Sequence, residues 1–140
     1  MRVVAPLIDA LLDRTLAEHA LGPEALAIVG FSQGTMMALH VGPRRERALA
    51  ALVGYSGRLV GGALLETEVL VRPPVMLIHG SADDMVPAQS MEEAGDALKT
   101  AGFTVETHLR PGLGHGIDPE GIALAGRFLA ASFADAAAVG

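Results

Sequence analysis

The sequence predicts an α/β fold: a parallel sheet with crossover helices on both faces. Short, almost wholly apolar runs alternate along the chain with longer segments whose apolar residues recur at helical spacing. Apolar runs without polar alternation are typical of strands buried on both faces. Because parallel strands need long crossover connections, usually helices, the alternation favours a parallel sheet. No linker, repeat or second domain is visible, so residues 1–140 are predicted to form a single domain.

The first half of the chain predicts two helix–strand pairs. A helix is expected over 6–20, where apolar and charged residues occupy opposite faces, and Gly22-Pro23 ends it. A buried strand over 26–30 follows, and then a second helix over 33–41. The strand over 49–53 is expected to be buried in the same way.

The second half of the chain predicts an irregular segment, two further strands and two further helices. The irregular segment, 55–73, is rich in glycine and is expected to hold a short helical turn around Leu64. The other elements are a strand over 75–78, a helix over 87–101, a strand over 103–109 and a last helix that Asp118 and Pro119 begin. Right-handed crossovers then place the four strands in sequence order, with 26–30 at one edge and 103–109 at the other.

Composition narrows the class of protein. With 51% hydrophobic and 19% charged residues, the chain is too apolar for a disordered protein and too interrupted by charge for a membrane span. The net charge of −6 disfavours binding to nucleic acid or to an anionic membrane surface. The chain has no cysteine, which excludes thiolate catalysis and is typical of a reducing compartment. A soluble, cytoplasmic domain without a signal peptide is therefore predicted.

The segment 30–34, Gly-Phe-Ser-Gln-Gly, matches the pattern G-x-S-x-G directly after a predicted strand and directly before a predicted helix. There a serine lies on a sharp, strained turn that lifts its hydroxyl above the carboxyl edge of the sheet. A Cβ at Gly30 or at Gly34 is expected to collide with neighbouring backbone. Ser32 is therefore predicted to be a nucleophile. The alternative is a glycine-rich turn with a helix-capping serine.

A nucleophilic serine needs a base, and the base needs an orienting acid. In this fold class the chain order is Ser, then Asp or Glu, then His, on loops that follow later strands. Asp83 and Asp84 follow the third predicted strand, and His115, framed by glycines, follows the fourth. We expect His115 to take the proton of Ser32 and Asp83 to orient His115, with Asp84 as the competing acid.

The other histidines are weaker candidates for the base. His19 and His40 lie on or beside predicted helices, and His108 lies within a predicted strand. His79 ends a strand beside Gly80, where an orienting or packing role is expected.

Three segments resemble the phospholipase/carboxylesterase family of α/β-hydrolases, which includes acyl-protein thioesterase-like enzymes. They are Gly-Phe-Ser-Gln-Gly over 30–34, His-Gly-Ser-Ala-Asp-Asp-Met-Val-Pro over 79–87 and Gly-Leu-Gly-His-Gly-Ile over 112–117. The resemblance runs from about residue 3 to residue 133. It implies that Ser32 is the nucleophile, Asp83 the acid and His115 the base. It also implies that Gln33, which follows the nucleophile, donates its backbone N–H to the oxyanion.

The resemblance includes one departure from the family pattern. Family members carry several strands before the helix that precedes the nucleophile, and these strands bring an H-G-x-G-type loop with the second oxyanion donor. Here Met1 is followed at once by that helix, so the chain is expected to be the C-terminal part of an α/β-hydrolase fold, truncated at its N-terminus. The strand over 26–30 would then be an exposed apolar edge, which favours a homodimer.

The predicted function is that of a serine carboxylic-ester hydrolase that acts on small acyl esters through an acyl-enzyme. No metal or organic cofactor, no nucleic-acid partner and no membrane span are expected. Two alternatives stay open: a thioesterase acting on acyl thioesters, and a catalytically impaired fragment that lacks the second oxyanion donor.

Overall fold

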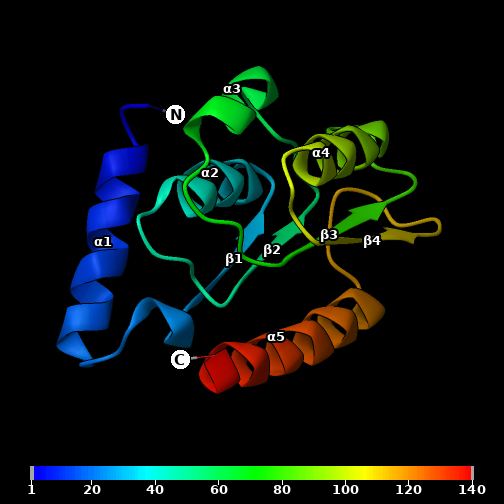
Figure 1. The fold of residues 1–140 in the computed structure, drawn as a ribbon. Helices are drawn as coiled ribbons and strands as arrows, with labels where there is room; N and C mark the ends of the chain where they lie inside the picture. The colour runs from blue at the N-terminus through cyan, green and yellow to red at the C-terminus, as the bar shows by residue number, and fades with distance from the viewer. Residues whose placement is uncertain (1, 140) are drawn as a thin grey trace.

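The computed structural model describes residues 2–139, which form a parallel sheet between two layers of helices (Figure 1). The strands are β1 (Ala27–Phe31), β2 (Ala51–Tyr55), β3 (Val75–Gly80) and β4 (Val105–Arg110). They pair in that order, and every pair is parallel. The predicted fold class and strand order are confirmed, with β1 and β4 at the edges. Because all strands run the same way, their carboxyl ends meet at one edge of the sheet.

Helices cover the two faces of the sheet unequally. The helices are α1 (Ala5–Glu18), α2 (Gln33–Val41), α3 (Gly62–Glu68), α4 (Gln89–Thr100) and α5 (Pro119–Val139), with short 3₁₀ helices η1 (Pro23–Ala25) and η2 (Gly42–Arg44). On one face α2 contacts β1 and β2, and α4 contacts β3 and β4, while α1 packs on α2 and α3 on α4. On the opposite face α5 runs below the sheet and contacts β2 and β3 (Figure 1).

Element bounds differ from the prediction where buried residues do not pair. β2 begins at Ala51 and not at Leu49, and β4 at Val105 and not at Phe103. Leu49 and Phe103 are buried in the core just before the ladder begins, which is why their apolar character extended the predicted strands. The turn expected around Leu64 is a full helix, α3.

The side chains of the strands alternate between two cores. On the face of α2 and α4, buried residues include Leu39, Leu52, Val75, Leu77 and Leu98. On the face of α5 they are Val53, Tyr55, Met76, Ile78 and Ala125. Every residue of β2 and β3 is buried, as predicted for strands covered on both faces.

β1 is not buried on both faces, and that prediction is wrong. Ile28 packs against the core under α2, but Val29 is 54% exposed and Phe31 41% exposed. These two residues are in register with Val53 and Tyr55 of β2, so they face the side of the sheet that α5 covers. Because α5 packs on β2 and β3, β1 is left open on that face as well as along its edge.

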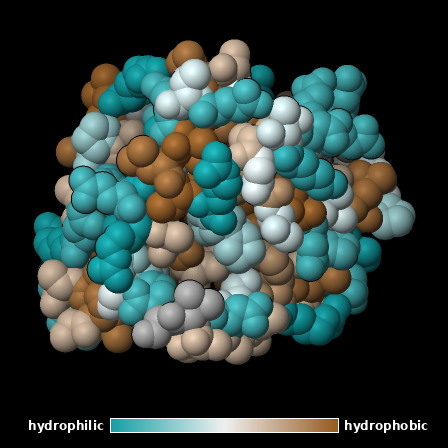
Figure 2. Space-filling model, in the orientation of Figure 1, coloured by the Kyte–Doolittle hydropathy of each residue, from teal (hydrophilic) through white to brown (hydrophobic). Residues whose placement is uncertain are grey.

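Further hydrophobic surface lies on α1, where Leu7 is 68% and Leu11 50% exposed. From the direction of Figure 1, brown hydrophobic areas interrupt the teal hydrophilic surface (Figure 2). Arg45 of the segment after η2 holds α1 in place, because its nearly buried guanidinium pairs with Asp9 at 2.7 Å and with Asp13 at 2.8 Å. The helix is thus attached by charge on one side and exposes apolar residues on another.

α5 also has the length and composition of a membrane-spanning helix over Pro119–Ala138, with 17% of that stretch buried. Its buried residue Ala125 and its partly buried neighbours Leu124 and Phe128 pack on the sheet. A single helix of this kind is weak evidence for a span, because core helices of soluble proteins have similar composition. The expectation of no membrane span stays a prediction.

The two-sided core predicts where truncation is destabilising. We expect Leu52→Ala to lower the free energy of unfolding by about 2–5 kcal/mol, because Leu52 is 0% exposed and its removal leaves a cavity. Leu7→Ala on exposed α1 is the matched control and should change it by about 0.5 kcal/mol or less. Urea unfolding followed by circular dichroism measures both, and equal effects would contradict the packing described here.

Candidate active site

Ser32 lies on a strained turn between β1 and α2. Its φ is 55° and its ψ −113°, a combination that non-glycine residues adopt only when surrounding contacts hold them there. One such contact is the hydrogen bond from the Ser32 N–H to the carbonyl of Tyr55 on β2, at 2.8 Å. The strained serine predicted from the motif is therefore found.

The two glycines of the motif differ in what they do. A Cβ on Gly30 would lie 2.5 Å from the carbonyl carbon of Gly34 and 2.6 Å from the nitrogen of Thr35, so Gly30 lets the helix approach the strand. The same expectation for Gly34 is wrong, because nothing lies within 4 Å of a Cβ built there. Gly34 is in the first turn of α2 and is exposed to solvent.

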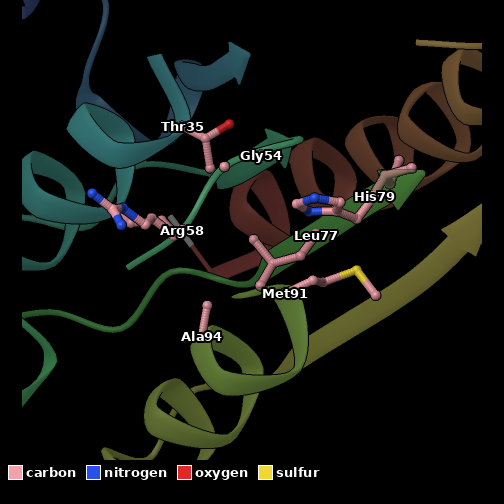
Figure 3. Close-up of a pocket in the computed structure, with 10 residues that line it drawn as sticks. Thr35, Gly54, Arg58, Leu77, His79, Met91 and Ala94 are labelled. Atoms are coloured by element: carbon pink, nitrogen blue, oxygen red, sulfur yellow. The ribbon is translucent and has the colours of Figure 1, made fainter. Parts of the chain in front are cut away.

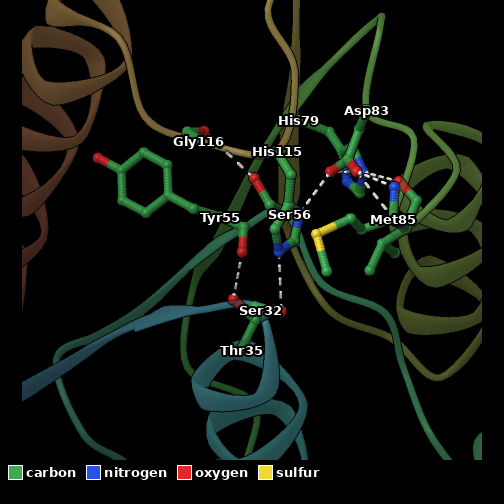
Figure 4. Close-up of polar contacts among 10 residues, drawn as sticks. Ser32, Thr35, Tyr55, Ser56, His79, Asp83, Met85, His115 and Gly116 are labelled. Carbon is green, nitrogen blue, oxygen red and sulfur yellow. Dashed lines mark hydrogen bonds and ion pairs between the residues drawn. The ribbon is translucent and has the colours of Figure 1, made fainter.

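Thr35, which the sequence analysis did not single out, holds this turn from behind. Its side chain is buried, and its Oγ1 lies 2.9 Å from the carbonyl oxygen of Gly30 and 2.8 Å from that of Tyr55 (Figure 4). One hydroxyl proton is thus shared between the carbonyls near the ends of β1 and β2. Gly54 and Gly57 leave the space for Thr35, since a Cβ on either would collide with its side chain.

The structure brings Ser32, His115 and Asp83 together (Figure 4). Ser32 Oγ lies 3.1 Å from Nε2 of His115, and Nδ1 of His115 lies 2.8 Å from Oδ2 of Asp83. Asp84 is exposed, and among residues 2–139 no hydrogen bond of its side chain is found. Of the two candidate acids, Asp83 is the one that contacts His115. The ring of His115 also packs on the ring of Phe31, with centroids 4.9 Å apart.

The side chain of Asp83 is completely buried but well supplied with donors. Its Oδ1 accepts the backbone N–H groups of Met85 and Val86, both at 2.9 Å. Burial raises the pKa of Asp83, but the hydrogen bonds from Val86, His115 and Met85 together outweigh it and leave the pKa below its ordinary value of 3.8. Asp83 is thus an ionised carboxylate at neutral pH, able only to accept hydrogen bonds from its neighbours.

The loop that carries His115 lies against the end of the sheet at two points. Ser56, a buried residue with φ of 52° after β2, donates its hydroxyl to the carbonyl of Gly116 at 3.3 Å. Gly80 at the end of β3 lies directly under the loop, where a Cβ would collide with the carbonyl of Leu113. No sequence motif points to Ser56, because its contact joins residues 60 positions apart.

The other candidate residues named from the sequence lie within helices and strands or at their ends. Gln33 is the first residue of α2, so its backbone N–H belongs to the helix N-terminus, where donors have no intrahelical partner. His108 lies in β4 and His40 in α2, as predicted. His79 is buried at the end of β3, next to Asp83.

The space beneath the candidate site is small. A cavity of about 10 Å³ lies between α2, the strands β2 and β3, and α4, and Thr35, His79 and Met91 contribute to its lining (Figure 3). This is roughly the volume that one water molecule needs, so no substrate chain fits there. A depression of about 480 Å³ adjoins it between the segment that starts at Arg58 and α4. Within residues 2–139 no cluster of His, Asp and Glu side chains could hold a metal ion.

The fold and the serine turn define the class: this is a protein of the α/β-hydrolase type. A family model described as Phospholipase/Carboxylesterase matches residues 1–133, and the chain belongs to that family.

Relatives and solved structures agree with this assignment. The chain is 32% identical over 103 residues to acyl-protein thioesterase 1 of Gibberella zeae, covering 70% of this chain and 44% of the relative. It is 32% identical over 123 residues to the carboxylesterase SOBER1 of Arabidopsis thaliana, covering 79% and 49%. The crystal structure of esterase PE8 matches with a TM-score of 0.89 and 41% identity, covering 91% of this chain and 60% of that one. The chain thus spans about half the length of the curated relatives it matches.

The lowered pKa of Asp83 predicts a pH-dependent contribution to stability. Because the folded pKa lies below the unfolded value of about 3.9, the unfolded state binds more protons between the two values. The contribution is therefore complete above the unfolded pKa and is lost as the pH falls through the folded pKa. We expect Asp83→Asn to cost about 1.5–3 kcal/mol at pH 7 and progressively less toward pH 3.

Urea unfolding of the wild type, Asp83→Asn and the exposed control Asp84→Asn at several pH values measures this difference. A gap between wild type and Asp83→Asn that stays constant from pH 7 to pH 3 would contradict the role given to the carboxylate charge.

Proposed function

We propose that this protein is a serine carboxylic-ester hydrolase with Ser32, His115 and Asp83 as its triad. The observation that carries the proposal is the continuous contact from Ser32 Oγ to His115 Nε2, and from His115 Nδ1 to Asp83 Oδ2, at 3.1 and 2.8 Å. Membership of the family and the esterase and thioesterase names of its relatives support it.

The direction of proton transfer follows from the charge of Asp83. An ionised carboxylate accepts a hydrogen bond from the Nδ1–H of His115, so the proton stays on Nδ1, and Nε2 carries the lone pair that accepts the hydroxyl proton of Ser32. Ser32 Oγ attacks the ester carbonyl, and His115 then delivers the proton to the departing alcohol. Water resolves the acyl-enzyme by the same route in reverse. No step in this sequence uses a metal or an organic cofactor.

The developing oxyanion needs hydrogen-bond donors, and the N-terminus of α2 supplies one. In our proposal the backbone N–H of Gln33 donates to it, aided by the helix dipole. A second donor would come from a loop in the part of the family's hydrolase domain that this chain does not match. With one donor alone the rate should be lower by about 10²–10³, which is the catalytically impaired alternative.

The rim of the site favours an apolar acyl group. Each triad residue has an exposed hydrophobic neighbour within two positions in sequence: Phe31 is 41%, Met85 72% and Ile117 43% exposed. The cavity of about 10 Å³ below the site leaves no room for an acyl chain, so in our proposal the chain lies over these side chains or in the adjoining depression of about 480 Å³. A thioester presents the same acyl group, and thioesterase activity stays the alternative. The lack of cysteine supports a reducing compartment such as the cytoplasm.

The proposal predicts that Ser32 alone carries the acyl group. We expect a fluorophosphonate, which phosphonylates activated serines, to label the wild type once and Ser32→Ala not at all. Turnover of a short-chain p-nitrophenyl ester should fall to background in Ser32→Ala. Ser90→Ala on α4 is the control and should behave like the wild type. Mass spectrometry and an absorbance assay measure the two effects, and unchanged turnover in Ser32→Ala would refute the proposal.

We also propose that a second copy of the chain pairs along the open edge of β1. Its unpaired edge and its exposed Val29 and Phe31 form an apolar strand of the kind that associates. We expect Val29→Glu to shift a dimer toward monomer in light scattering, whereas Leu109→Glu, on the exposed edge strand β4, should not. If the wild type is monomeric at micromolar concentration, the pairing is refuted.

A further inference from the structure

A second imidazole lies against the carboxylate of Asp83. His79, at the end of β3, is 2% exposed. Its Nε2 lies 2.8 Å from the carbonyl oxygen of Val86 and 3.2 Å from Oδ2 of Asp83 (Figure 4). The same Oδ2 accepts the hydrogen bond of His115. Two histidines therefore meet one carboxylate oxygen from different sides.

The surroundings of Nε2 determine which nitrogen of His79 carries the proton. A backbone carbonyl can only accept a hydrogen bond, and so can an ionised carboxylate. A lone pair on Nε2 would face two oxygens at 2.8 and 3.2 Å, which is repulsive. Nε2 of His79 therefore bears hydrogen and donates to Val86, with the positive end of the N–H dipole also facing Oδ2 of Asp83.

These contacts close a ring. His79 donates to the carbonyl of Val86, the N–H of Val86 donates to Oδ1 of Asp83, and Oδ2 of Asp83 returns to His79. Rotation of the Asp83 carboxylate would break the bonds at Oδ1 and move Oδ2 away from His115. His79 at the end of β3 thus holds the carboxylate of Asp83, in the following loop, through its hydrogen bond to Val86, 7 residues further along the chain.

We propose that His79 is a positioning residue that keeps Oδ2 of Asp83 aligned with Nδ1 of His115, an inference that rests on the proposed ester-hydrolase function. His79 does not contact Ser32 and takes no proton from the substrate. It acts through Asp83, whose alignment sets the orientation and tautomer of His115. A residue that served only to fill the core would need no polar atom at this position.

Two substitutions separate positioning from packing. His79→Gln places an amide N–H near the position of Nε2, whereas His79→Phe keeps the ring volume and removes the donor. We expect His79→Phe to slow both phosphonylation by a fluorophosphonate and kcat about 10-fold or more, with little change in KM, because the hydrogen bond to Val86 and the N–H dipole that faces the Asp83 carboxylate are both lost. His79→Gln should recover most of that loss. His108→Phe, on β4, is the control and should leave both rates unchanged.

Nitrogen NMR of ¹⁵N-histidine-labelled protein gives a readout that does not require turnover. The wild type should show a protonated Nε2 for His79 and a protonated Nδ1 for His115. The His115 Nδ1 proton should exchange faster with solvent in His79→Phe than in His79→Gln or the wild type. A protonated Nδ1 and bare Nε2 on His79, or an His79→Phe enzyme with wild-type kcat, would overturn the proposal.

The ester-hydrolase mechanism and the positioning role of His79 can fail independently of each other. If Ser32→Ala retains turnover, the ester-hydrolase mechanism fails whatever His79 does. If Ser32→Ala is inactive but both His79 variants lose kcat equally in folded protein, the mechanism survives and the donor role of His79 is wrong.

Discussion

The position of the Ser32 backbone is the constraint on which the rest of the structure depends. A non-glycine residue at positive φ is under strain of about 1–3 kcal/mol and persists only where its neighbours hold it. Here the holding contacts come from the sheet itself: the carbonyl of Tyr55 accepts the Ser32 N–H, and Thr35 ties the carbonyls of Gly30 and Tyr55 together. The order of the strands, which sets β1 beside β2, is thus a requirement of the serine turn and not only of the core.

Each member of the proposed triad is supported by a different buried polar residue. Thr35 supports Ser32, Ser56 supports the loop of His115, and His79 lies beside Asp83. All three supporting side chains lie at or next to the carboxyl end of the sheet and are shielded from water. Since buried polar groups must be paired, a movement of the His115 loop would leave Ser56 unpaired, and a movement of the Asp83 loop would leave His79 unpaired. The buried polar side chains beneath the site therefore oppose displacement of the loops that carry the proposed triad.

The sequence was sufficient for features that depend on local pattern. Continuous apolar runs predicted β2 and β3, and the motif over 30–34 predicted the strained Ser32. The resemblance predicted the exposed edge of β1, but exposure of its face was not predictable from the pattern, because Val29 and Phe31 are as apolar as buried residues and their exposure depends on which strands α5 covers. Thr35 and Ser56 were missed for a related reason: their partners lie 20 and 60 residues away. Gly34 shows the opposite error, since matching a motif does not show that a position is crowded.

Phe31 connects the open edge of the sheet with the chemistry of the site. Its ring packs on the ring of His115 while 41% of the residue remains exposed on β1. A strand that paired with β1 would cover Phe31 and exclude water from one side of His115. Lower polarity around the imidazole strengthens its interaction with the Asp83 carboxylate, because electrostatic attraction grows as water is removed. Coverage of the β1 edge would therefore also change the surroundings of His115, the proposed base, through Phe31.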